Sequence, residues 1–178
     1  RAQKKDGSSN AAMIAQRPKL SIMDIPNHEI NGKVVAVRVD FNVPLTASGE
    51  ISDPSRIIEA LPTINYLRNN GAKIVLISHL GRGSESLKPI YNELKRQLND
   101  TQVKFDEHFL TMADAHSIIK GMNNGDILLL ENVRLNQEET AKTIDQNFVD
   151  RLFHGADMIV TDAFGTAHRA QASVVGAP

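Results

Sequence analysis

The sequence contains no cysteine, which excludes disulfide bonds, thiol nucleophiles and zinc sites built on thiolates. It also lacks a surplus of charge, because 20 Lys and Arg residues face 21 Asp and Glu residues and leave a formal net charge of -1. Without an overall basic field we expect neither nucleic acid nor a membrane as a partner, so any anion site must be local. No run of about 18 apolar residues is present to span a bilayer. The histidines include no zinc-protease pattern, and no metal-binding residue is predicted.

Residues 1–18 are polar, rich in Ala and Ser, and have no periodic hydrophobic pattern. This composition favours a flexible N-terminal tail. The remnant of an organelle-targeting peptide is the alternative, since such peptides are basic and rich in Ser and Ala, although Asp6 and the short length argue against it. The chain has 178 residues, 41% of them hydrophobic, so we expect one folded domain over residues 19–178.

Apolar and β-branched runs alternate with segments of helical period from Lys33 onward. The runs predict strands at 34–39, 74–78, 126–131 and 158–162, and a weaker strand at 101–105. Helices are predicted at 55–70, 88–98, 113–122 and 140–153, and Pro62 indicates a kink or a later start in the first of them. Strands that are apolar nearly throughout, joined by segments long enough for a helix, are typical of parallel sheets. The predicted fold is therefore α/β: a doubly wound, Rossmann-like parallel sheet with helices on both faces.

Polar side chains follow four of these strands at the point where each strand ends. The segments concerned are Asp40-Phe41-Asn42, His79 to Arg82, Glu131 to Arg134, and Asp162 to Arg169. In open parallel sheets, ligands bind outside the carboxyl ends of the strands. We therefore expect these four segments to form a single site.

Three of the four strand ends carry an arginine, and Arg56 stands at the start of the helix after the first strand. A guanidinium group binds carboxylate and phosphate through two parallel hydrogen bonds and stays charged. Asp40 and Asn42 can accept hydrogen bonds from ligand hydroxyls or orient the arginines. Glycines in the same loops, at 81, 83 and 165, allow the backbone to approach a ligand. This combination predicts a site for a small phosphorylated acid.

Other interpretations of these residues remain open. A single strand-end arginine is typical of a solvated or ion-paired surface residue, and only the convergence of several points to a site. Arg38 lies within the first strand, where it either pairs with a carboxylate such as Asp40 or adds to a basic patch. Taken alone, His79 is typical of a structural histidine. Structural roles are also expected for the histidines at 28, 108, 116 and 154, and Glu138-Glu139 is predicted to be a solvated charge pair near a helix start.

Four motifs, RVDFNVP, SHLGR, LLLENVR and DAFGTAHRA, resemble in order and spacing the N-terminal domain of phosphoglycerate kinase, over residues 19–178. The resemblance implies a glycolytic domain that binds 3-phosphoglycerate or 1,3-bisphosphoglycerate. It also implies a C-terminal domain, absent from this sequence, that binds Mg²⁺ with ATP or ADP and meets the first domain by hinge closure. A cytoplasmic monomer is implied as well. We expect this chain to bind the acid but to be inactive alone. The alternative is a non-catalytic module that binds phosphoglycerate or a partner.

The resemblance also assigns roles to residues. Asp40 and Asn42, with Phe41 between them, would contact the hydroxyl and carboxylate end of the glycerate, and Arg56 would be catalytic by reaching the transferred phosphoryl group. The substrate's phosphate and carboxylate would be held by His79, Gly81, Arg82, Arg134 and Arg169, with His168 nearby. The sequence departs from the family at Gly83, where the family usually has proline after the arginine.

Overall fold

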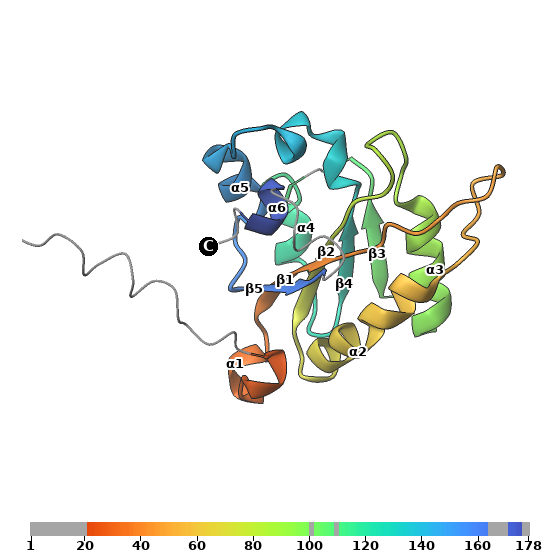
Figure 1. Ribbon diagram of the computed structural model, residues 1–178. Coiled ribbons are helices and arrows are strands. Elements are labelled where there is room, and N and C mark those ends of the chain that lie inside the picture. Colours follow the sequence, from red (N-terminus) through yellow and green to blue (C-terminus); the bar gives the residue numbers. More distant parts are fainter. Residues whose placement is uncertain (1–20, 100–101, 109–110, 164–170, 176–178) are drawn as a thin grey trace, which may run out of the picture.

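The computed structural model describes residues 21–99, 102–108, 111–163 and 171–175 (Figure 1). At its centre is a parallel sheet of five strands with the order β3-β4-β2-β1-β5. All five predicted strands are confirmed, with ends displaced by at most two residues. The strands are β1 (Val34–Val39), β2 (Lys73–Ile77), β3 (Val103–Asp106), β4 (Ile127–Leu130) and β5 (Met158–Asp162).

Helices connect the strands. The α-helices of the described residues are α1 (Asn27–Ile30), α2 (Ser55–Asn69), α3 (Lys88–Leu98), α4 (His116–Lys120), α5 (Gln146–Leu152) and α6 (Ala172–Val175). Short 3-10 helices lie at η1 (Ile22–Asp24), η2 (Val133–Leu135) and η3 (Gln137–Thr140).

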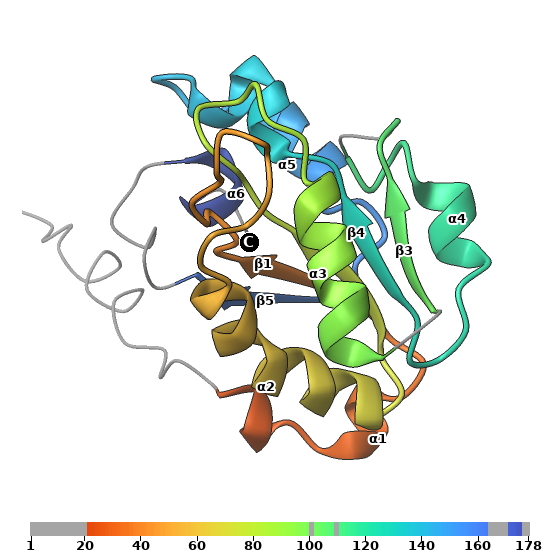
Figure 2. The same cartoon turned by 90° about the vertical axis from the view of Figure 1, so that its right-hand side faces the viewer.

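The sheet is covered on both faces, as predicted. Successive strand residues point to opposite faces, so Val35 and Val37 of β1 pack in one core cluster with buried residues of α2 and α3. Ala36, between them, packs in a second cluster with buried residues of α4, α5 and α6. Figures 1 and 2 show α2 and α3 on one side of the sheet and α5 and α6 on the other. This arrangement confirms the doubly wound α/β fold.

Two predicted helices are shorter than expected. At α4, the backbone N–H of Ala113 donates to the carbonyl of Arg151 (3.0 Å). This contact joins the segment to the end of α5, and the helix itself begins at His116. At α5, the Asp145 carboxylate accepts from the N–H of Asn147 (2.9 Å) and caps the helix there. The segment before it forms η3 instead of a continuous helix.

Helix α2 follows the prediction more closely. It runs from Ser55 to Asn69 with Pro62 inside it, so the suggested later start is wrong. Asp53 accepts hydrogen bonds from both the N–H (2.9 Å) and the hydroxyl (2.5 Å) of Ser55. These contacts fix the first residue of the helix and place Arg56 one position further along.

The strand order brings the motif-bearing loops together. Strands β4, β2, β1 and β5 are consecutive neighbours in the sheet, and each is followed by one of the four polar segments. Strand β3 has no such segment and lies at the edge. Because all strands are parallel, these carboxyl ends lie along one side of the sheet (Figure 1).

Candidate functional site

The loops after β1 and β2 are tied together by hydrogen bonds. Ser78 is fully buried, and its hydroxyl donates to the carbonyl of Val39 (3.0 Å) and accepts from the N–H of Phe41 (3.0 Å). The side-chain carbonyl of Asn42 accepts from the N–H of Gly81 (2.9 Å). The ring of Phe41 is itself fully buried in the core. Phe41 therefore anchors the loop and presents its neighbours, rather than its own ring, at the sheet edge.

The loop after β4 is joined to the loop before α3 through two residues of the ENVR segment. Asn132, fully buried, accepts from the N–H of Leu80 (3.2 Å) and donates to the carbonyls of Leu80 (2.8 Å) and Glu85 (2.7 Å). Glu131 accepts from the N–H of Leu87 (2.7 Å) and from the hydroxyl of Ser86 (2.7 Å). Sequence reasoning gave Glu131 and Asn132 no role, although a buried strand that runs directly into a carboxylate and an amide is a usable signal.

Arg134 and the glycines before α3 meet at this junction. The Arg134 side chain is partly buried, and its Nη1 donates to the carbonyl of Gly81 (2.5 Å). Gly83 has a φ of +108°, and a Cβ there would lie 2.6 Å from the carbonyl oxygen of Arg134. The glycine required at position 83 thus allows this loop to lie directly on the backbone of Arg134.

Arg56 forms an ion pair with Asp40. The distance from Arg56 Nη1 to Asp40 Oδ2 is 2.5 Å, and the side chains are 46% and 11% exposed, respectively. The helix start therefore brings the predicted catalytic arginine to the first strand-end motif. Arg82 is exposed in its loop, while His168 and Arg169 lie outside the described residues.

Arg38 lies at the centre of a buried polar chain. Its side chain is fully buried, and it donates from Nη1 to the carbonyl of Val39, from Nη2 to Nδ1 of His79 (3.1 Å) and from Nε to the hydroxyl of Ser173 (2.8 Å). His79 is only 1% exposed. His79, which was predicted for the anion site, and Arg38, for which a basic patch was one of two alternatives, are therefore both buried.

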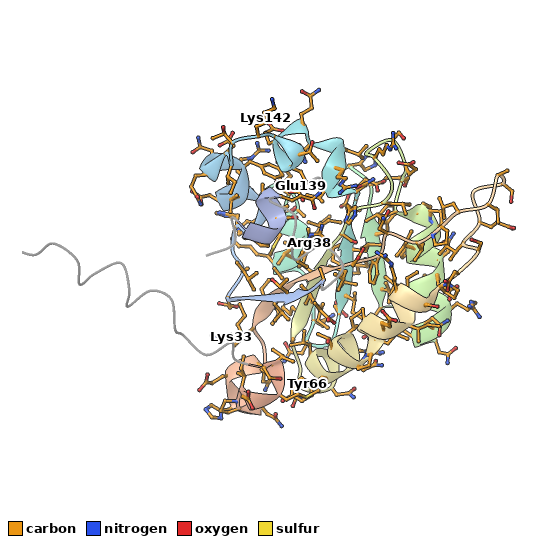
Figure 3. All side chains as sticks on the ribbon, in the orientation of Figure 1. Lys33, Arg38, Tyr66, Glu139 and Lys142 are labelled. Carbon is orange, nitrogen blue, oxygen red and sulfur yellow. The ribbon has the colours of Figure 1, made fainter. Side chains whose placement is uncertain are left out.

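Glu139 completes this chain and corrects a prediction. It is fully buried, and its carboxylate accepts from the N–H (2.9 Å) and the hydroxyl (2.5 Å) of Ser173. The expectation that Glu138-Glu139 is a solvated pair is wrong for Glu139, because η3 turns this side chain toward α6 while Glu138 stays exposed. Figure 3 labels Glu139, in η3, above Arg38, in β1.

Burial governs the ionisation of this cluster. Burial lowers the pKa of the Arg38 guanidinium, and the positive charge of Arg134 lowers it further. The negative charges of Glu139 and Asp40 oppose this shift. Burial raises the pKa of the Glu139 carboxyl. The hydrogen bonds from Ser173 and the positive charges of Arg38 and Arg134 oppose this shift. Arginine stays protonated in proteins, so two cations and two carboxylates lie close together at the sheet edge.

Other candidate sites are not supported in the described part of the chain. His116 and His154 contact each other edge to face, with ring centroids 5.3 Å apart, which fits the structural role expected for them. Among the described residues, no group of three His, Asp or Glu side chains is placed to hold a metal ion. No helix within the described ranges is long and apolar enough to cross a membrane.

Comparison with known proteins assigns this arrangement to a family. Residues 24–178 match the family model described as phosphoglycerate kinase. The phosphoglycerate kinase of Dictyoglomus turgidum is 45% identical over 163 residues, and that of Clostridium beijerinckii is 46% identical over 159 residues. Each alignment covers 89% of this chain, and 40% and 39% of the respective relative. The chain thus spans about 40% of the length of the curated relatives that it matches.

Solved structures agree. Phosphoglycerate kinase from Coxiella burnetii aligns with 88% of this chain and 38% of its own, at 34% identity and a TM-score of 0.72. The enzyme from Pyrococcus horikoshii aligns with 83% of this chain and 38% of its own, at 32% identity and a TM-score of 0.74. With a family model that covers nearly all of the described residues and the same fold in solved members, this chain belongs to the phosphoglycerate kinase family.

Proposed function

We propose that residues 19–178 form the substrate-binding domain of a phosphoglycerate kinase. This domain would hold 3-phosphoglycerate or 1,3-bisphosphoglycerate during the reversible glycolytic transfer of a phosphoryl group to ADP. The observation that carries the proposal is the convergence of Asp40, Asn42, Arg56 and Arg134 on one edge of the sheet, in a chain that matches this family.

The chemistry of these groups suits a phosphorylated acid. Arg134 can offer a guanidinium fork to phosphate or carboxylate oxygens, while Asp40 and Asn42 can accept from the glycerate hydroxyl. Arg56 is 46% exposed, which supports its proposed catalytic role toward the transferred phosphoryl group. The further substrate-binding residues of the proposal are Phe41 through its backbone, His79, Gly81, Arg82, His168 and Arg169, with Arg38 as part of the basic patch.

The second half of the reaction requires a bound nucleotide. Phosphoryl transfer is catalysed by positioning donor and acceptor and by cations around the moving group. We assign Mg²⁺ and ATP or ADP to a separate nucleotide-binding domain, brought to the acid by hinge closure. The complete protein is proposed to act as a cytoplasmic monomer.

Calorimetric titration of the 178-residue chain with 3-phosphoglycerate tests the proposal. We expect weak binding, in the high micromolar range or weaker, because only one face of the substrate is covered. Glycerate without the phosphate is the control ligand and should bind less tightly. The same preparation should form no ATP from 1,3-bisphosphoglycerate and ADP. Failure to bind 3-phosphoglycerate, or kinase activity that copurifies with the chain, would contradict the proposal.

A further inference from the structure

Four buried side chains from four different parts of the chain form one continuous hydrogen-bonded path. Glu139 of η3 contacts Ser173 of α6, Ser173 contacts Arg38 of β1, and Arg38 contacts His79 after β2. The successive distances are 2.5, 2.8 and 3.1 Å, and none of the four residues is more than 1% exposed. The path therefore links η3 and α6 to the loop after β2 through side chains that are all buried.

The direction of each hydrogen bond is determined by chemistry. An ionised carboxylate only accepts, so the Ser173 hydroxyl donates to Glu139 and its oxygen accepts from Arg38 Nε. Guanidinium only donates, so Nδ1 of His79 is the acceptor. A neutral imidazole that accepts at Nδ1 carries its proton on Nε2. The structure thus selects one of the two neutral forms of His79.

We propose that Glu139 is a positioning residue that holds His79, through Ser173 and Arg38, as the neutral ring protonated at Nε2. For its effect on substrate, this inference rests on the proposed function. An N–H at Nε2 can donate to a carboxylate or phosphate oxygen, whereas a lone pair at the same atom would repel that oxygen. Under the proposed function, the form of the ring that Glu139 holds is the one that donates to a substrate oxygen.

Glu139 is needed because Arg38 is a buried cation. The planar guanidinium fixes the directions of the three hydrogen bonds that Arg38 donates. One of them goes from Nε to the Ser173 hydroxyl, and the Glu139 carboxylate orients that hydroxyl. A glutamine at position 139 would lack the charge and would present an amide N–H toward groups that already donate. The Ser173 hydroxyl would then turn, and Arg38 would lose its orientation toward His79.

Long-range proton–nitrogen NMR spectra of histidine-labelled chain at about pH 8 test the tautomer directly. In the wild-type chain we expect the His79 ring to be protonated at Nε2. Glu139→Gln should shift a measurable population to the Nδ1-protonated form, and exposed Glu138→Gln is the matched control that should not. Ser173→Ala interrupts the same path one bond later and serves if Glu139→Gln fails to fold. A wild-type ring protonated at Nδ1, or an unchanged tautomer in both variants, would overturn the proposal.

A double-mutant cycle separates positioning from a merely structural role. Glu139→Gln alone should weaken binding of 3-phosphoglycerate roughly tenfold, but less than about twofold in a His79→Ala background, because residues in one network are coupled. Equal losses in both backgrounds would show that Glu139 acts on the fold and not through His79. The NMR measurement needs no ligand. Absence of 3-phosphoglycerate binding in the wild-type chain would therefore count against the proposed function, and the tautomer alone would then decide the inference.

Discussion

Arg134 holds a loop of the protein and is also one of the proposed anion-binding residues. Its Nη1 donates to the carbonyl of Gly81, which fixes the plane of the guanidinium. We predict that Arg134→Lys lowers the affinity for 3-phosphoglycerate by about 2 kcal/mol although the charge is kept, because an ammonium cannot reproduce the planar fork. Calorimetry is the measurement. The control is Arg96→Lys, at an exposed position of α3 where Arg96 pairs with Glu93. Equal affinity of the two variants for 3-phosphoglycerate would show that Arg134 contributes only its charge and not its planar geometry.

Arg56 is expected to act mainly on the reaction rate. It lies at a helix start, is 46% exposed, and forms an ion pair with Asp40. An ion pair this exposed contributes at most about 1 kcal/mol to stability. Arg56 can therefore leave Asp40 and bind a phosphoryl group at little cost in free energy. An interaction formed only in the transition state lowers the barrier without tightening substrate binding.

In a full-length kinase that carries this sequence, Arg56→Ala should therefore reduce kcat by roughly 10²-fold, with a much smaller effect on 3-phosphoglycerate affinity. Steady-state kinetics measure the two quantities separately. We expect Arg169→Ala to show the opposite balance. An intact kcat with a raised KM for Arg56→Ala would mean that this arginine binds the ground state.

Candidate site residues that lie within a few positions of the end of an apolar run could be predicted from the sequence. Asp40, Asn42 and Arg134 are of this kind, and the structure brings all three to one edge of the sheet. Glu139 could not be found in this way, because Gln-Glu-Glu-Thr is typical of an exposed helix start. Its burial depends on Ser173, 34 residues further along, and a contact at that separation leaves no local pattern.

At the scale of elements, the loop between β2 and α3 depends on Gly83. A Cβ at this position would lie 2.6 Å from the carbonyl oxygen of Arg134, and the φ of +108° is itself strained for other residues. We predict that Gly83→Ala destabilises the fold by about 2 kcal/mol, measured by urea unfolding, and weakens 3-phosphoglycerate binding because Arg134 is displaced.

Gly49→Ala is the matched control for this effect. Gly49 also has a positive φ, +81°, but a Cβ there would meet nothing within 4 Å. It should therefore show the conformational cost alone, about 1 kcal/mol, with unchanged ligand affinity. Equal destabilisation of the two variants would show that contact with Arg134 contributes nothing.

The strands were easier to predict than the helix ends, for a physical reason. Strands buried on both faces, such as β1 and β4, are continuous apolar runs that the sequence displays directly. The segment before α4 instead contacts the distant Arg151 through the N–H of Ala113, and the helix begins at His116. The hydrophobic pattern of residues 113–122 is typical of a helix throughout, but only His116–Lys120 are helical in the structure.

At the scale of the whole molecule, a nearly neutral chain concentrates charge where the strands end. The formal net charge is -1, yet Arg38 and Arg134 lie close enough to Glu139 for their charges to affect its pKa. The buried carboxylate reduces the repulsion between these cations in the absence of ligand. This compensation links the stability of the fold to the ionisation of a single side chain.

Stability should therefore depend on pH through Glu139. Burial raises the pKa of this carboxyl above its ordinary value of 4.5, against the hydrogen bonds of Ser173 and the charges of Arg38 and Arg134. The folded chain then binds this proton more tightly than the unfolded chain does. The stability gained from the proton is fully present below the ordinary pKa and is lost as pH rises through the folded-state pKa.

We predict that the unfolding free energy of the wild-type chain minus that of Glu139→Gln decreases as pH rises from about 4.5 to about 8. Glutamine does not titrate, so the other ionisable groups cancel in the difference. Urea unfolding at a series of pH values measures it, and Glu138→Gln controls for removal of a charge at the exposed neighbouring position. A difference that increases as pH rises would mean that the Ser173 hydrogen bonds and the two arginines outweigh burial, and that the folded protein holds Glu139 preferentially as the anion.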